Sequence, residues 1–263
     1  MTGSRHAPGG MRRHARRPLD RQRLYVRHSA ASDAGAWSVE YDVDWDGIDV
    51  ALARSQPEVL SQLRASALVE SFHPVHLGRL LPAIVEDVDA TTVVALEMYE
   101  GFKHFHALRR YLDVVGHLPV ITDQELIDIR RGVECEPMPS EEVVPRLVRF
   151  MLSEHLASHY FRRLAARVRE PVLRALLRTM AADEVRHAQG AFDLVARRVR
   201  DDRTLVPVVL AAASSFRHFG EEAVEEVPVA ESGDAQAIRS FARRIERLCG
   251  VRLVDHLRDT LPA

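Results

Sequence analysis

The feature that most constrains this fold is a helical apolar period that runs through the chain from about residue 49 onward. Apolar side chains recur three and four residues apart, the spacing that places them on one face of an α-helix. The sequence offers no convincing run of alternating β-branched residues between turn signals, which is the pattern of a half-buried strand. The sequence therefore predicts an all-α protein.

Prolines and capping residues divide this pattern into elements. Four long helices are expected, over residues 56–85, 89–115, 140–169 and 171–200. Pro74 and Pro82 predict kinks or one-turn breaks in the first helix, because a proline cannot donate a helical hydrogen bond. Ser140 is the expected N-cap of the third helix, and Pro171 suits the first turn of the fourth. A capping box at residues 122–125 predicts a short helix that ends near residue 132.

Composition suggests three regions within the 263 residues. Residues 1–48 are expected to form a disordered, arginine-rich N-terminal tail and leading segment, because eight arginines face a single acid in the first thirty positions. Residues 49–220 are expected to form a helical bundle. Residues 221–263 are expected to form an acidic loop followed by C-terminal helices that cap this bundle.

Charge and cysteine usage narrow the classes of function. The net charge of −2 and the pI near 6.7 give no general reason to expect nucleic-acid or membrane-surface binding. No stretch approaches the roughly 20 apolar residues that span a bilayer. Cys135 and Cys249 lie far apart and belong to no CxxC pattern, which argues against a disulfide framework or a zinc knuckle. The expected location is a reducing cytoplasm.

Carboxylates and histidines interrupt the apolar face of each long helix. They are Glu70 on the first helix, Glu100 and His104 on the second, Glu154 on the third, and Glu184 and His187 on the fourth. Their neighbours at helical spacing are apolar, so these side chains are expected to point inward. Burying an unpaired carboxylate costs roughly several kcal/mol, unless cations lie between the charges. The pattern predicts a two-metal site, and its oxygen and imidazole donors suit iron or manganese better than zinc.

The second helix departs from the pattern of the fourth. The carboxylate and histidine of the fourth helix are three residues apart, whereas Glu100 and His104 are four apart, which still makes them neighbours on a helix. Gly101 lies in mid-helix, where it costs about 1 kcal/mol relative to alanine, and so indicates a close approach at this level. Glu97, one turn before Glu100, is a rival for the ligand position.

Other polar residues of these helices have expected supporting roles. His73 and His159 lie within two turns of predicted ligands, and packing or outer support is favoured for them over direct contact with a metal. Asp183 is expected to face away from its neighbour Glu184 and to hold a ligand histidine from outside. Lys103, the only lysine of the chain, is expected to face solvent.

These residues carry a resemblance to a known family. Residues 180–187, Met-Ala-Ala-Asp-Glu-Val-Arg-His, resemble the Ala-Asp-Glu-Lys-Arg-His segment of the soluble acyl-carrier-protein desaturases, which belong to the ferritin-like di-iron superfamily. Further likenesses are Glu70 with Pro74 four residues later, the segment 153–159 around Glu154, and His104 with residues 109–112, Arg-Arg-Tyr-Leu. The likeness covers roughly residues 55–220. Where that family has its second-helix ligand glutamate, this chain has Gly101.

The resemblance implies a ferritin-like four-helix bundle with additional C-terminal helices and two irons per chain. It implies an O2-dependent enzyme that introduces a double bond into an acyl chain bound to acyl carrier protein or to CoA. A ferredoxin-type electron donor and a homodimer are implied as well. Basic residues that could meet an acidic carrier are Arg109, Arg110, Arg130 and Arg131.

Three alternatives to desaturation stay open on the sequence. The first is a di-metal oxygenase that hydroxylates or N-oxidises a small molecule with the same ligands. The second is ferritin-like iron handling, in which iron itself is the substrate. The third is a metal-free bundle whose carboxylates form a polar network.

Overall fold

The computed structural model describes residues 23–131, 138–219 and 235–260. All the regular elements in these ranges are α-helices or 3-10 helices, which confirms the predicted all-α class. The α-helices are α1 (Leu24–Ala34), α2 (Val50–Arg54), α3 (Pro57–Glu70), α4 (His73–Leu80), α5 (Val88–Val114), α6 (Asp123–Arg131), α7 (Val143–Arg167), α8 (Pro171–Asp201), α9 (Val206–Ser214), α10 (Ala235–Cys249) and α11 (Leu253–Thr260). Short 3-10 turns are η2 (Trp45–Gly47), η3 (Leu81–Ile84), η4 (Ser140–Glu142) and η5 (Arg203–Leu205).

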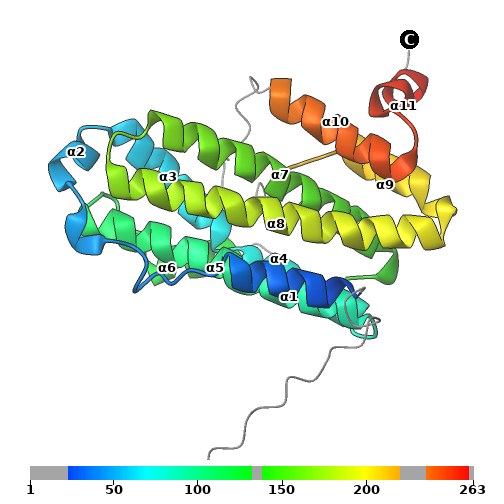
Figure 1. Ribbon diagram of the computed structural model, residues 1–263, viewed down its shortest axis with the longest axis horizontal. Helices are drawn as coiled ribbons and strands as arrows, with labels where there is room; N and C mark the ends of the chain where they lie inside the picture. Colours follow the sequence, from blue (N-terminus) through cyan, green and yellow to red (C-terminus); the bar gives the residue numbers. More distant parts are fainter. Residues whose placement is uncertain (1–22, 132–137, 220–234, 261–263) are drawn as a thin grey trace, which may run out of the picture.

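The four predicted long helices form the body of the molecule, with α3 and α4 together serving as the first. Helices α5, α7 and α8 run along the long axis, α3 and α4 pack on α5, and α7 packs on α8 (Figure 1). The chain thus makes two helical hairpins that face each other. Facing helices of such a bundle can project side chains into a shared interior.

The interior consists of two apolar clusters, one toward each end of the bundle. One cluster contains residues of α4, α5, α7 and α8, among them Leu77, Val94, Leu147 and Leu194. The other cluster contains residues of α3, α5, α7 and α8, among them Leu63, Leu108, Phe161 and Leu177. In every helix the predicted metal ligands fall between the residues of these two clusters. A buried polar layer therefore lies between two apolar ends, and both ends hold it in place.

The first long helix is broken at both predicted prolines. Helix α3 ends at Glu70 and α4 begins at His73, with Pro74 in its first turn. The proline ring clashes with the carbonyl four residues earlier, which is that of Glu70, and ends the helix there. Pro82 likewise lies in the first turn of η3. The break places Glu70 and His73 at the meeting ends of two helices.

Helix α1 corrects the expectation of a tail over residues 1–48. Residues 24–34 form a helix that lies along α5 and α8 (Figure 1). Leu24 is buried, and the backbone N–H of Tyr25 donates to Asp89 Oδ1 at 3.1 Å. Arg27, which counted toward a solvated tail, pairs with Asp193 of α8 at 3.4 Å. Residues 1–22 and 221–234 lie outside the described residues, and the division into three regions otherwise stays a prediction.

The start of the third long helix also differs from its prediction. Ser140 opens the 3-10 turn η4, and α7 begins only at Val143, with Glu142 at its N-cap and no side-chain cap. The reason is Pro145, which lacks the N–H that would bond the carbonyl of Glu141 in a continuous α-helix.

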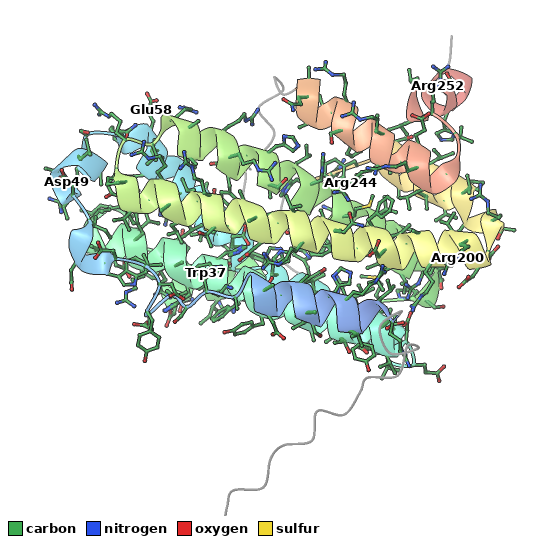
Figure 2. The ribbon with its side chains drawn as sticks, viewed as in Figure 1. Trp37, Asp49, Glu58, Arg200, Arg244 and Arg252 are labelled. Carbon is green, nitrogen blue, oxygen red and sulfur yellow. The ribbon has the colours of Figure 1, made fainter. Side chains whose placement is uncertain are left out.

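The C-terminal helices cover one end of the bundle. Helix α9 packs on α7, and α10 packs on α7, α8 and α9. Arg244 of α10 reaches α8, where it donates to the carbonyl of Ala188 at 3.4 Å (Figure 2). These are the additional C-terminal helices that the sequence predicted, and their role as caps stays a prediction. Among the described residues, no helix has the combination of length and hydropathy that crossing a membrane requires.

Candidate metal centre

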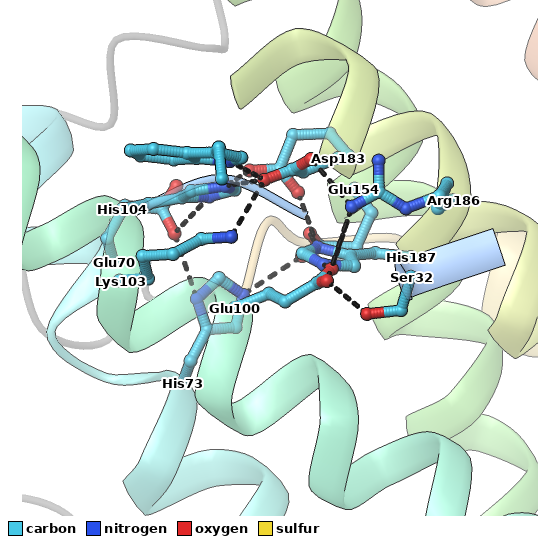
Figure 3. A network of polar contacts seen from close by, with 12 residues as sticks. Ser32, Glu70, His73, Glu100, Lys103, His104, Glu154, Asp183, Arg186 and His187 are labelled. Atoms are coloured by element: carbon cyan, nitrogen blue, oxygen red, sulfur yellow. Dashed lines mark hydrogen bonds and ion pairs between the residues drawn. The ribbon is translucent and has the colours of Figure 1, made fainter. Parts of the chain in front are cut away.

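A cluster of buried ionisable side chains lies in the polar layer between the apolar clusters (Figure 3). Its members are Glu70, His73, Glu97, Glu100, His104, Glu154, Asp183, Glu184 and His187. They come from α3, α4, α5, α7 and α8. Every residue predicted as a ligand on the four long helices therefore points inward, as the helical spacing indicated.

Five of the six predicted ligands converge into two overlapping groups. Glu70, His104 and Glu184 form one group, and Glu154, Glu184 and His187 form the other. Within each group the ligand atoms all lie within 4.8 Å of one another. Glu184 belongs to both groups, so one carboxylate can serve two neighbouring cations.

The polar atoms at the middle of the centre fit a bound cation. His104 Nδ1 lies 2.9 Å from Glu184 Oε1 and 3.8 Å from Glu70 Oε2. All three atoms are buried, and none has a hydrogen-bond partner. Leaving a buried polar atom unsatisfied costs about 1–3 kcal/mol. A cation between them would satisfy all three atoms at once.

The two histidines predicted as ligands are oriented in the same way. His104 Nε2 lies 2.9 Å from Asp183 Oδ2, and His187 Nε2 lies 2.8 Å from Glu100 Oε2. Both histidines turn Nδ1 toward the carboxylates of the centre. A carboxylate at Nε2 keeps the proton on that nitrogen and leaves the Nδ1 lone pair for a metal. The supporting contact predicted for Asp183 is therefore present.

Glu100 lies at the edge of the centre and belongs to neither ligand group. Its Oε1 accepts from Ser32 Oγ at 2.6 Å, and its Oε2 lies 3.1 Å from Arg186 and 2.8 Å from His187. Burial alone would raise its pKa, but the contact with His187 and these donors lower it to about 2. The position that lies three residues before His104 is 101, and residue 100 points about 100° away from it. Glu100, which was predicted as a ligand, thus contacts His187 and lies outside both groups, and its part in metal binding stays a prediction.

The alternative ligands take other places. Burial raises the pKa of Glu97 well above its ordinary value, which favours the neutral form of its carboxyl group. Glu97 packs against α8 where Gly190 leaves room, and a Cβ at that position would overlap its Oε1. His159 packs against the ring of His155, with centroids 4.9 Å apart. Neither Glu97 nor His159 belongs to a ligand group.

A second set of contacts covers the outer side of His104. Asp183 Oδ2 accepts from Trp37 Nε1 at 2.7 Å, and Asp183 Oδ1 lies 2.6 Å from Arg186. Lys103 does not face solvent as predicted, for it is only 7% exposed. Its Nζ lies 3.7 Å from Asp183 Oδ2 and 4.4 Å from the centre of the Trp37 ring. The lysine is buried because the segment around Trp37, expected to be a tail, covers this side of α5.

Residues of the leading segment were the ones that sequence reasoning missed. Ser32 and Trp37 contact Glu100 and Asp183, yet both lie in the region interpreted as a solvated tail. One signal was available, because the two tryptophans of the chain, Trp37 and Trp45, both lie in this region. Aromatic residues are scarce in disordered segments.

We predict that the metal-free protein becomes less stable as the pH rises above about 6.5. Burial lowers the pKa of His73, but the charges of Glu154 and Glu70 overcome it and raise that pKa to about 10. Stability from a raised histidine pKa is complete below the unfolded value of about 6.5 and is lost as the pH passes through 10. Burial and the charge of Glu154 raise the pKa of Glu184 to about 7, and ionisation of this group acts in the same direction.

Urea unfolding of chelator-treated protein between pH 6 and pH 10 measures this effect. A decrease in unfolding free energy of a few kcal/mol, roughly, is expected across that range. A constant or rising stability would show that the histidine at position 73 is not held as a cation in the metal-free protein.

The helices have the fold of a ferritin-like four-helix bundle, with additional C-terminal helices as predicted. Among solved structures the chain is similar to the R2-like ligand-binding oxidase from Sulfolobus acidocaldarius, with a TM-score of 0.64 and 13% sequence identity. The match covers 89% of this chain and 94% of that one. No family model matches the chain, and neither does any curated protein sequence. At this identity the likeness shows the fold, and the desaturase family stays a prediction.

Proposed function

We propose that the chain is a di-iron oxidoreductase that uses O2. The observation that carries this proposal is the position of Glu184, whose Oε1 lies 2.9 Å from His104 Nδ1 and whose Oε2 lies 2.9 Å from His187 Nδ1. A carboxylate that faces two separate ligand groups suits two adjacent metal ions. Ferritin-like bundles build such sites from side chains on facing helices.

The donor set favours iron, with manganese as the second choice. Glu70, Glu154 and Glu184 supply oxygen, and His104 and His187 supply imidazole nitrogen. Carboxylate and imidazole together suit iron and manganese, whereas structural zinc prefers thiolates in a closed tetrahedron. Bound irons would supply the one-electron and O2 chemistry that amino-acid side chains lack.

The protein's own contribution is to hold the ligands and to keep water away from them. The apolar clusters close both sides of the polar layer, and the ligand residues are fully or almost fully buried. Arg186 lies 2.6 Å from Asp183 and 3.1 Å from Glu100, and so joins the two carboxylates that orient His104 and His187. A low-dielectric site with fixed ligand orientation controls the reactivity of its metals.

We propose that the substrate is an acyl chain bound to acyl carrier protein or CoA. This finer proposal rests on the resemblance of residues 180–187 to the soluble desaturases. The reaction removes two hydrogens from adjacent methylenes, while O2 takes these and two electrons from a ferredoxin-type donor, with two protons, to give water. A homodimer and a cytoplasmic location complete the proposal. The one cysteine among the described residues, Cys249, is buried and free, which fits a reducing compartment.

The basic residues proposed for an acidic carrier already have internal partners. Arg109 pairs with Asp123 at 3.0 Å, and Arg110 pairs with Glu40 at 2.6 Å. Arg131 pairs with Asp128 at 3.0 Å, and Arg130 donates to the carbonyl of Ser71 at 2.9 Å. Such exposed pairs are worth little and can open, so these arginines are weak support for a carrier site.

A specific observation favours the alternative of a small-molecule oxygenase. A cavity of about 300 Å³ lies on the outer side of Lys103, lined also by Trp37, Tyr99, Phe102 and His106. This volume is at the lower end of the range for ligand pockets, which suits a small aromatic or aliphatic molecule. The ring of Trp37 stacks on that of His104, with centroids 6.3 Å apart, so one side chain separates the cavity from a predicted metal ligand.

A single-turnover experiment under ¹⁸O2 distinguishes these reactions. The reduced, iron-loaded protein is mixed with a saturated acyl chain on acyl carrier protein, and the chain is released and analysed by mass spectrometry. Our proposal predicts a product that lacks two hydrogen atoms and carries no ¹⁸O. A product with one ¹⁸O would establish oxygenation instead. Unchanged acyl chain, with iron oxidised and retained as a growing mineral, would establish iron handling.

A further inference from the structure

We propose that His73 is a ligand of the metal centre and takes the place of a carboxylate that the second ligand helix lacks. The proposal rests on the two-metal centre proposed above and deepens it. It enlarges the ligand set proposed above from three carboxylates and two histidines to three carboxylates and three histidines.

The vacant place is visible when the two ligand helices are compared. In α8, Glu184 precedes the inward-facing His187 by three residues, whereas the equivalent position before His104 in α5 is Gly101. A Cβ built on Gly101 would come within 2.5 Å of Cγ and 2.9 Å of Cβ of His73. The ring of His73 therefore fills the space that a side chain at position 101 would occupy. Glycine at this position is explained by that close approach.

The broken first helix brings His73 to this place. Helix α3 ends at Glu70, and α4 starts at His73 after the break that Pro74 enforces. The edge of the Phe150 ring packs against the imidazole, with centroids 6.0 Å apart. His73 is 6% exposed, and its ring lies among the polar side chains of the layer (Figure 3).

The two ring nitrogens of His73 are placed like those of the other ligand histidines. Nδ1 lies 2.9 Å from Glu70 Oε2, and neither of these buried atoms has a hydrogen-bond partner. Nε2 lies 3.2 Å from Glu154 Oε1, which can hold its proton. His104 and His187 likewise turn Nδ1 inward and Nε2 toward a carboxylate. Both nitrogens of His73 therefore face carboxylates of the cluster, one inward and one outward, as in a ligand histidine with an outer carboxylate.

Glu70 Oε2 connects His73 to the atoms of one ligand group. Glu70 Oε2 lies between His73 Nδ1 at 2.9 Å and His104 Nδ1 at 3.8 Å, and His104 Nδ1 lies 2.9 Å from Glu184 Oε1. All four atoms lack hydrogen-bond partners. His73 lies outside the group of Glu70, His104 and Glu184 in the metal-free structure and contacts it through Glu70 Oε2, so a small shift of the ring would add it as a fourth donor. Glu100 is left free to orient His187 from outside.

The test uses Co(II) as the probe metal, because a histidine bound to Co(II) gives a hyperfine-shifted, exchangeable N–H signal in the proton NMR spectrum. Wild type, His73→Ala and His159→Ala are loaded without oxygen, and Co(II) per chain is measured by elemental analysis. We expect three such signals in wild type and in His159→Ala. His73→Ala should show one signal fewer, with Co(II) affinity lower by about tenfold or more.

A double variant keeps the test informative if His73→Ala binds Co(II) too weakly to be loaded. His73→Ala/Gly101→Glu removes the ring and supplies a carboxylate at the vacant place. Its Co(II) affinity should recover, with two histidine signals and not three.

The outcomes separate this inference from the proposed function. Wild type that binds fewer than about two Co(II) per chain would contradict the two-metal centre itself. Wild type that binds two Co(II) but shows two histidine signals, both kept in His73→Ala, would overturn the role of His73 and leave the centre standing.

Discussion

Replacing Glu184 with glutamine should remove both metal ions from the protein while the fold survives. Glu184 is the one residue shared by both ligand groups, and it is completely buried. Glutamine keeps its size but supplies no negative charge and only one oxygen. Iron content after anaerobic loading should decrease from about two per chain to near zero, measured by elemental analysis after gel filtration.

Glu58→Gln is the matched control for this variant. Glu58 lies exposed in the first turn of α3, so the same substitution there removes a carboxylate without touching the centre (Figure 2). It should leave the iron content unchanged, and circular dichroism should show equal helicity in both variants. Full iron content in Glu184→Gln would mean that the carboxylate between the two groups is not a shared ligand.

Asp183→Ala should be the most destabilising single substitution outside the metal ligands. Asp183 accepts from Trp37 at 2.7 Å, contacts His104 Nε2 at 2.9 Å and pairs with Arg186 at 2.6 Å. Alanine leaves all three donors without this partner, one of them a charged guanidinium. Breaking a buried ion pair from one side costs about 3–5 kcal/mol, and we expect that loss in the urea unfolding of the metal-free protein.

The same variant should also weaken metal binding, because His104 loses the carboxylate that orients it. Loss of such an outer partner lowers metal affinity by about 10- to 100-fold. Asp201→Ala, at the exposed end of α8, is the control and should change neither property. A variant of Asp183 with wild-type stability would show that Trp37, His104 and Arg186 find other partners, and that the aspartate does not hold the histidine in place.

The long helices and their inward-facing ligands could be predicted because both follow from one period. The spacing that places apolar residues on one face of a helix also places Glu154 or His187 on that face. Prolines then mark the ends, as Pro74 and Pro171 do. No knowledge of neighbouring helices is needed for these steps.

The exact ligand set could not be predicted in the same way, because it depends on contacts between helices. Glu100 lies on the expected face, but Arg186 of α8 and Ser32 of α1 draw it to the edge of the centre. The space beside Gly101 is filled by His73, which belongs to another helix. The pattern within one helix does not show which side chain of a neighbouring helix fills the space beside a glycine.

The prediction of a disordered tail was wrong for residues 23–48, because it rested on the net charge of the segment and not on the positions of its few apolar residues. Its arginines include partners of acids far away in sequence, as with Arg27 and Asp193. Trp37 covers Lys103 and Asp183, so the lysine expected in solvent is buried beneath the segment expected to be disordered. Both errors have this single cause.

The most direct test of the two-metal centre is a Mössbauer measurement on protein loaded anaerobically with ⁵⁷Fe(II), before and after one pulse of O2. The proposal predicts about two irons per chain. Before O2 both should be high-spin ferrous, and after O2 they should form one antiferromagnetically coupled diferric pair. Less than one iron per chain, or isolated ferric ions without coupling, would contradict a centre built around Glu184.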